Sequence, residues 1–227
     1  MISSYDYEDS LAEAKFLYDL CVKDDNHREV LTNLVVISLV TSIEVFAERI
    51  LEYFLLEYNK LSVEAHKIER ELKIAHSNCL SDRINDLKSH SHKVNDLESC
   101  FNELAKIWSS TEKITLKFDT KFPKGKHGEL QIKKLFKKIG IEDVFSEVKI
   151  VIETEDMLNE EELLDIDKFI GDLTGNRNRA IHEGTRLHTF ISNENLKKYI
   201  EYMESIIRQI SNLVLKKLQE IEVSCTR

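Results

Sequence analysis

Apolar residues recur every three to four positions along most of the chain, which is the spacing that places them on one face of an α-helix. The longest such stretch runs from about His27 to Tyr58, and a shorter one precedes it from Tyr7 to Val22. Ser62 is a candidate N-cap for a third helix, whose pattern fades near residues 76–78. A fourth helix is expected from about Asp82 to Trp108.

The second half of the chain begins with a stretch that has no helical period. Between Ser109 and Gly128, the alternation of polar and apolar residues at 115–122 predicts a short strand or an extended loop. Three further helices are expected, at Glu129–Ile139, Asn159–Glu183 and, capped by Ser192, Asn195–Ile221. We therefore predict an all-α fold, an up-and-down helical bundle in one domain over residues 1–227, with an irregular insert at about 109–158.

The composition supports a helical fold and excludes other classes. One proline and six glycines leave few turn-forming residues in 227, so a many-stranded sandwich or barrel is excluded. Hydrophobic residues make up 42% of the chain, which is enough for a packed core rather than disorder. The most apolar run, Leu34 to Ile43, has ten residues and is too short to cross a bilayer. We expect no membrane association.

The formal net charge of −9 argues against a general, sequence-nonspecific nucleic-acid binder, which is usually basic. The charge is unevenly distributed, because residues 113–138 hold nine lysines against two acids and residues 142–167 hold eleven acids against one lysine. Each block is either a solvated face or a functional one, in which the lysines guide a polyanion and the acids screen them or contact a partner. The candidate RNA-binding residues are Lys121, Lys124, Lys126, Lys133, Lys134, Lys137 and Lys138.

The cysteines give no sign of a disulfide framework or a metal site. The four, at positions 21, 79, 100 and 225, are far apart with no CxxC pair, and no signal-type segment opens the chain. We expect reduced thiols and a cytoplasmic protein. A zinc site is disfavoured because its candidates are irregularly spaced in polar helix, and we expect neither a metal ion nor a cofactor. Those candidates are His76, Cys79, His90, His92 and Cys100.

The segment from Thr174 to Gly184 carries the best candidates for chemistry. Arg177 continues the apolar stripe of its predicted helix, and a buried guanidinium needs a partner. Glu44 lies on an apolar helix face in the same way, and either Arg177 or Arg179 would serve as its partner. We expect Glu44 to position the arginine rather than to take part in the chemistry.

Asn178 lies four positions before His182, so the two side chains share a helix face and the amide can orient the imidazole. An imidazole exchanges protons near neutral pH, and a guanidinium binds a phosphate bidentately and stabilises transition-state charge. Together they suit cleavage of RNA, whose 2′-hydroxyl is a built-in nucleophile, without a metal. Arg177 and His182 lie about 140° apart around one helix, so motifs from two copies of the chain converge better than one. Alternatively, His182 is a surface histidine near a helix end, and Arg177 has only a structural role as the salt-bridge partner of Glu44.

The run Arg177–His182 resembles the Arg-polar-x-x-x-His signature of the HEPN superfamily, all-α domains that include many metal-independent ribonucleases. Leu135–Val144 and the early run Leu39–Phe46 are similar to the RiboL-PSP group within that superfamily. The resemblance implies that Arg177, Asn178 and the histidine at the end of the run are motif residues. It also implies a homodimer, because in that superfamily the catalytic pocket forms between two copies of the domain.

These observations predict a metal-independent endoribonuclease with RNA as its substrate. In this reading His182 is a general acid or base, Arg177 stabilises the pentacovalent phosphate and Asn178 orients the site, with support from Glu44 and Arg179. The resemblance further implies a toxin or antiviral-defence effector and leaves room for a protein or antitoxin partner. The alternative is a non-catalytic HEPN-like module that binds and regulates RNA, a nucleotide or a protein. A purely structural dimerisation bundle is a third reading.

Overall fold

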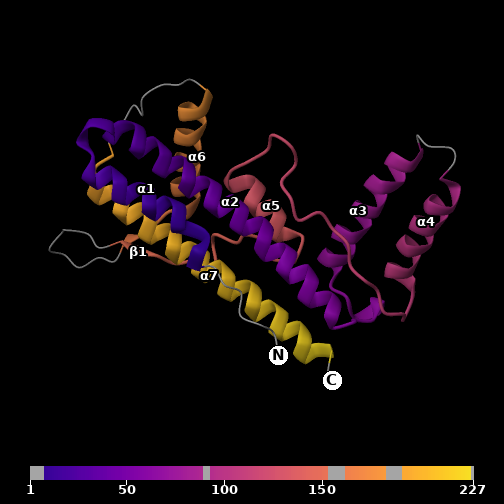
Figure 1. Cartoon of the computed structure of the whole chain (residues 1–227). Coiled ribbons are helices and arrows are strands. Elements are labelled where there is room, and N and C mark those ends of the chain that lie inside the picture. The colour runs from indigo at the N-terminus through magenta and orange to yellow at the C-terminus, as the bar shows by residue number, and fades with distance from the viewer. Residues whose placement is uncertain (1–7, 89–92, 153–161, 183–190, 226–227) are drawn as a thin grey trace.

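A computed structural model describes residues 8–88, 93–152, 162–182 and 191–225 (Figure 1). Within these ranges the chain forms seven α-helices and one antiparallel pair of two-residue strands, so the all-α prediction is confirmed. The helices are α1 (Ala12–Lys23), α2 (Arg28–Lys60), α3 (Arg70–Lys88), α4 (Val94–Ser109), α5 (Glu129–Lys137), α6 (Ile166–His182) and α7 (Asn193–Cys225). The strands are β1 (Val151–Ile152) and β2 (Glu162–Leu163).

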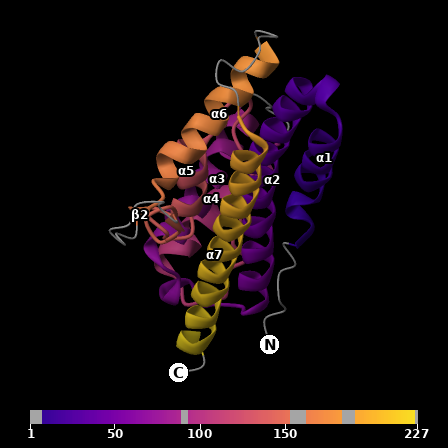
Figure 2. The same ribbon diagram turned by 90° about the vertical axis from the view of Figure 1, so that its left-hand side faces the viewer.

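Helix α2 is the central element of the bundle. It packs against α1, α5, α6 and α7, and Figure 2 shows α1 on one side of it and α6 on the other, with α7 running alongside. Residues 25–60 are long and apolar enough to cross a membrane by length and composition, although the ten-residue run from Leu34 to Ile43 alone is too short. In the fold, 56% of the most apolar window is buried, as in the core helix of a globular domain.

Helices α3 and α4 form a hairpin that projects from the bundle (Figure 1). The predicted boundary near residues 76–78 is wrong, because α3 continues through them to Lys88. His76 explains the error, since this polar residue is completely buried and occupies a core position. Ser62 does not cap α3 either, because it lies in a turn with φ of 51° and the helix begins only at Arg70.

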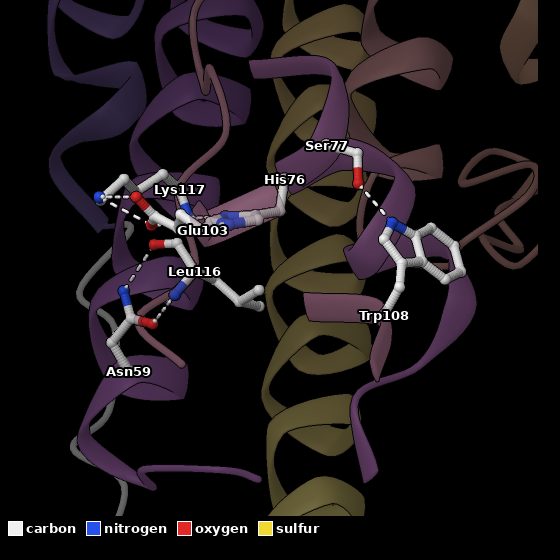
Figure 3. A network of polar contacts seen from close by, with 7 residues as sticks. All are labelled: Asn59, His76, Ser77, Glu103, Trp108, Leu116 and Lys117. Carbon is white, nitrogen blue, oxygen red and sulfur yellow. Dashed lines mark hydrogen bonds and ion pairs between the residues drawn. The ribbon is translucent and has the colours of Figure 1, made fainter. Parts of the chain in front are cut away.

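A network of side chains ties this hairpin to the segment that follows it (Figure 3). His76 Nδ1 accepts a hydrogen bond from the Lys117 backbone N–H at 3.0 Å, and Lys117 Nζ pairs with Glu103 of α4 at 2.8 Å. Asn59 of α2 bonds both the N–H and the C=O of Leu116. The predicted extended segment is therefore held by side chains rather than by a sheet, and His76 has a structural role.

The segment predicted as an irregular insert contributes to the main core. Leu116, Phe118, Phe136 and Phe145 are buried there together with residues of α2 and α7. Gly140, with φ of 78°, follows α5 and allows the chain to turn, which confirms the predicted end of that helix. The region from 109 to 158 is thus continuous with the packing of the bundle where it is described.

The boundaries of the last two helices differ in how well the sequence predicts them. Helix α6 begins at Ile166, and not near Asn159, because Glu162–Leu163 pairs with β1 as a strand. Asn159 itself lies outside the described residues. Ser192 is confirmed as a cap, since its Oγ accepts a hydrogen bond from Asn195 N–H at 3.2 Å at the start of α7.

Candidate active site

Glu44 is a buried carboxylate in the middle of α2, at the point where α6 crosses it. Its Oε2 accepts a hydrogen bond from Arg177 Nη1 at 3.0 Å, and its Oε1 accepts one from Gly128 N–H at 3.1 Å. His127 Nδ1 lies 3.2 Å from the same Oε2 atom. A carboxylate removed from water needs such donors, and here they come from α6 and from the loop that leads into α5.

Arg177 reaches Glu44 because it extends the apolar stripe of α6. Ile166, Ile170 and Leu173 are buried on that stripe, and the Arg177 side chain on the next turn is only 11% exposed. Three of the five guanidinium N–H donors are used, one by Glu44 and two by the Asn178 amide oxygen. One N–H on each terminal nitrogen has no partner among the described residues.

Two neighbours of Arg177 differ from expectation. Asn178 Oδ1 accepts hydrogen bonds from Arg177 Nε at 3.2 Å and Nη2 at 3.1 Å, so the amide holds the guanidinium rather than the His182 imidazole. Arg179 is exposed and donates to Asn176 Oδ1 at 2.7 Å. Of the two arginines proposed as partners of Glu44, the structure selects Arg177.

His127 belongs to this cluster, and the sequence analysis did not identify it. It lies in the turn-rich loop before α5, and its side chain is 43% exposed although Nδ1 faces Glu44. A loop has no periodicity, so no helical pattern connects His127 to α2 or α6. The only signal in the sequence was the glycine that follows it.

Gly128 explains how the loop approaches α6 so closely. Its φ and ψ of 91° and −174° lie in a region that essentially only glycine adopts. A Cβ at this position would come within 3.2 Å of Thr174 Cγ2, one turn before Arg177. The missing side chain therefore lets the Gly128 N–H reach Glu44 and brings His127 beside it.

His182 is the last residue of α6 and is exposed, as is Ile181 before it. Figure 2 shows that the C-terminal end of α6 stands clear of α2 and α7. Five residues along an α-helix correspond to about 7.5 Å along its axis, so His182 lies well beyond the turn that carries Arg177. Gly184, the second glycine of the motif segment, lies outside the described residues.

A family model described as RiboL-PSP-HEPN matches residues 5–216. The chain belongs to the RiboL-PSP-HEPN family. The match includes Glu44, His127, Arg177 and His182, and it confirms the resemblance found in the sequence. No curated protein and no solved structure matches the chain.

In this RiboL-PSP-HEPN chain, four of the seven candidate RNA-binding lysines already have partners. Lys121 pairs with Glu48 and Glu52, and Lys137 pairs with Glu142. The hydrogen bond with Glu52 is the main cause of a raised pKa for Lys121. Both lysines are exposed and lie on protein carboxylates in the structure.

The other two paired lysines are more enclosed. Burial alone would lower the pKa of Lys133, but its bonds to Asp167 and Asp143 outweigh that effect and raise it. Burial lowers the pKa of Lys138, whose Nζ bonds the Asp119 carbonyl. Lys133 thus links α5 to the start of α6 and to the acidic segment, which is a structural role.

The remaining three lysines, Lys124, Lys126 and Lys134, are exposed and have no ion pair among the described residues. Lys124 and Lys126 flank Gly125 in the turn that ends at His127. Along the chain, these two lysines are the candidate RNA-binding residues nearest to His127.

Proposed function

We propose that this protein is a metal-independent endoribonuclease. The observation that carries the proposal is the state of Arg177, whose guanidinium is held by Glu44 and Asn178 yet keeps on each terminal nitrogen an N–H that no described residue accepts. A guanidinium that keeps an N–H on each terminal nitrogen has donors left for phosphate oxygens. Membership of the HEPN superfamily, which includes ribonucleases, supports this reading of the site.

The chemistry uses the 2′-hydroxyl of RNA as the nucleophile. This oxygen attacks the adjacent phosphorus, the bond to the 5′-oxygen breaks, and the products carry a 2′,3′-cyclic phosphate and a 5′-hydroxyl. Arg177 stabilises the pentacovalent phosphate, and Asn178 fixes the orientation of Arg177. His182 exchanges a proton with the 2′-oxygen or the leaving oxygen as general base or acid.

A homodimer completes the site in this proposal. Arg177 and His182 lie on different turns and different faces of α6, so one chain does not bring them to one phosphate. The exposed end of α6 presents His182 together with an apolar residue, Ile181, which is 54% exposed. A second copy that packs against this end places its His182 near the first copy's Arg177.

The remaining features fit a cytoplasmic effector that acts on RNA. The four cysteines are all free, as expected for a reducing compartment. Lys124 and Lys126 supply local positive charge on a chain with a net charge of −9, so they attract RNA without making the whole surface basic. We propose a role as a toxin or antiviral-defence effector, for which overexpression arrests growth.

The decisive experiment incubates the purified protein with RNA in excess chelator. Wild type cleaves the RNA and leaves cyclic phosphate ends, whereas Arg177→Ala and His182→Ala do not. A 2′-O-methyl RNA of the same sequence resists cleavage because it lacks the nucleophile. Cleavage that survives both substitutions, or that requires a divalent metal, contradicts the proposal, and RNA binding without cleavage favours the non-catalytic module.

A mixing experiment tests the composite site separately. Arg177→Ala and His182→Ala chains are each inactive, but a heterodimer of the two retains one site with both groups. Because half of the dimers are mixed and half of their sites are intact, the mixture recovers about a quarter of wild-type activity. No recovery in a mixture that demonstrably exchanges subunits argues against a site shared between copies.

A further inference from the structure

His127 and Arg177 contact the same oxygen of the same buried carboxylate. Glu44 Oε2 lies 3.2 Å from His127 Nδ1 and 3.0 Å from Arg177 Nη1. The three residues come from α2, α6 and the loop before α5, and they meet within one chain. A phosphate-binding arginine and an imidazole are thus adjacent without any contribution from a second copy.

The contact with Glu44 distinguishes the two ring nitrogens of His127. Nδ1 is the ring nitrogen that faces the carboxylate, so Nε2 is the one directed away from Glu44. In some hydrolases an acid orients a histidine through one ring nitrogen while the other ring nitrogen exchanges the proton. His127 is also 43% exposed, whereas Glu44 is nearly covered, so the imidazole is the group of the pair that RNA can reach.

We propose that His127 is the general base of the RNA cleavage reaction, an assignment that rests on the ribonuclease function proposed above. His127 Nε2 takes the proton of the 2′-hydroxyl as the 2′-oxygen forms its bond to phosphorus. The bond from phosphorus to the 5′-oxygen breaks, and His182 gives that oxygen a proton. One imidazole gains a proton and the other loses one, so no further reactant is needed.

The position of His127 in the chain supports this assignment. It follows Lys124 and Lys126, the exposed lysines of the same turn, so a phosphate drawn to the turn arrives beside the imidazole. Gly128 fixes the turn through its N–H on Glu44 Oε1. The base and the arginine are therefore positioned by one carboxylate, and His182 is left with the role of general acid.

The test compares His127→Asn with wild type on two substrates in excess chelator. Asparagine keeps a polar amide beside Glu44 but cannot take up the proton, so it separates catalysis from the positioning of Glu44. On ordinary RNA we expect His127→Asn to lower the cleavage rate about 100-fold or more. On RNA with a sulfur in place of the 5′-bridging oxygen, whose leaving group needs no protonation, His182→Ala recovers activity but His127→Asn does not.

His66→Asn is the matched control. His66 is also exposed, with Nδ1 3.5 Å from Glu64, but it lies in the connection between α2 and α3, and its substitution leaves cleavage unchanged. Thermal unfolding of each variant establishes that it is folded.

Three results overturn the inference. If His127→Asn cleaves ordinary RNA at nearly the wild-type rate, His127 is not a catalytic residue. If the sulfur substrate restores its activity, His127 is not the base. If wild type itself does not cleave RNA, the proposed function fails and this assignment falls with it, an outcome distinct from the first two, in which wild type is active.

Discussion

Glu44 and Arg177 are separated by 133 positions in the sequence, yet a 3.0 Å hydrogen bond joins Glu44 Oε2 to Arg177 Nη1. The same carboxylate receives the Gly128 N–H and contacts His127. One side chain of α2 therefore fixes the position of α6 and of the loop before α5. Substitution of Glu44 is therefore expected to affect both the stability of the fold and the proposed activity.

Glu44→Gln tests the buried pair directly. Glutamine keeps the shape of the side chain but removes the charge that compensates Arg177, and hydrogen bonds to charged groups contribute about 1.5–3 kcal/mol. We expect the free energy of unfolding to fall by about 2 kcal/mol and RNA cleavage to fall at least tenfold. Urea unfolding and the cleavage assay measure the two effects.

The control for this variant is Glu52→Gln. Glu52 lies two turns further along α2 and pairs with Lys121 at the surface, where an ion pair contributes little. We expect both its stability and its cleavage to match wild type. Equal behaviour of Glu44→Gln and wild type in both assays rules out the positioning role.

Gly128→Ala tests the close approach of the loop to α6. The backbone conformation there costs a residue with a side chain about 1–3 kcal/mol, and the new methyl group also meets Thr174 Cγ2. Gly125→Ala is the matched variant, because Gly125 also has a positive φ but an added Cβ there meets nothing within 4 Å. We expect Gly128→Ala to be the more destabilising of the two in urea unfolding.

A second substitution isolates the contribution of the contact. Thr174→Ser removes the Cγ2 atom, so it relieves part of the destabilisation when combined with Gly128→Ala. If Gly128→Ala lowers the free energy of unfolding no more than Gly125→Ala does, the loop is free to move away from α6.

The exposed lysines of the turn are expected to act on RNA through charge alone. Replacing both Lys124 and Lys126 with alanine weakens RNA binding and reduces the magnitude of the slope of log K against log salt concentration by roughly 1.4, because each of the two contacts to a single strand contributes about 0.7. The comparison is alanine at Lys121 and Lys137, whose charges are held by Glu52 and Glu142. An equal effect of the two double variants contradicts a specific role for the turn. Filter binding at several salt concentrations measures the slopes.

His76 makes stability depend on pH. Burial is the main cause of the lowered pKa of His76, whose ordinary value is 6.5. The Glu103 carboxylate favours the charged imidazole and the Lys117 ammonium disfavours it, and the effect of burial outweighs that of Glu103. The unfolded chain therefore binds a proton more readily than the folded one, so stability is full above pH 6.5 and falls as the pH decreases toward the folded pKa.

The variant that tests this is His76→Asn. Asparagine offers an acceptor for the Lys117 N–H without titrating, so unfolding free energies measured between pH 5 and pH 7.5 should vary less with pH than those of wild type. His66→Asn, at an exposed site, keeps the wild-type dependence. Parallel curves for His76→Asn and wild type would mean that other groups cause the pH dependence.

The sequence predicts which residues of a helix are buried, because helical periodicity controls this. It does not predict positions that depend on contacts between distant segments. The apolar stripes of α2 and α6 predict that Glu44 and Arg177 are buried and need partners, because helical geometry fixes which residues share a face. The choice between Arg177 and Arg179 follows only from the crossing of the two helices. His127 was missed because its position depends on Gly128 reaching Thr174, a contact between a loop and a distant helix.

The α3–α4 hairpin buries Leu80, Ile84, Leu87 and Cys100 in a cluster separate from the core that surrounds α2. The residues that hold Glu44 and Arg177 take no part in that cluster. Substitutions in the distal half of the hairpin are therefore expected to leave the contact between Glu44 and Arg177 unchanged.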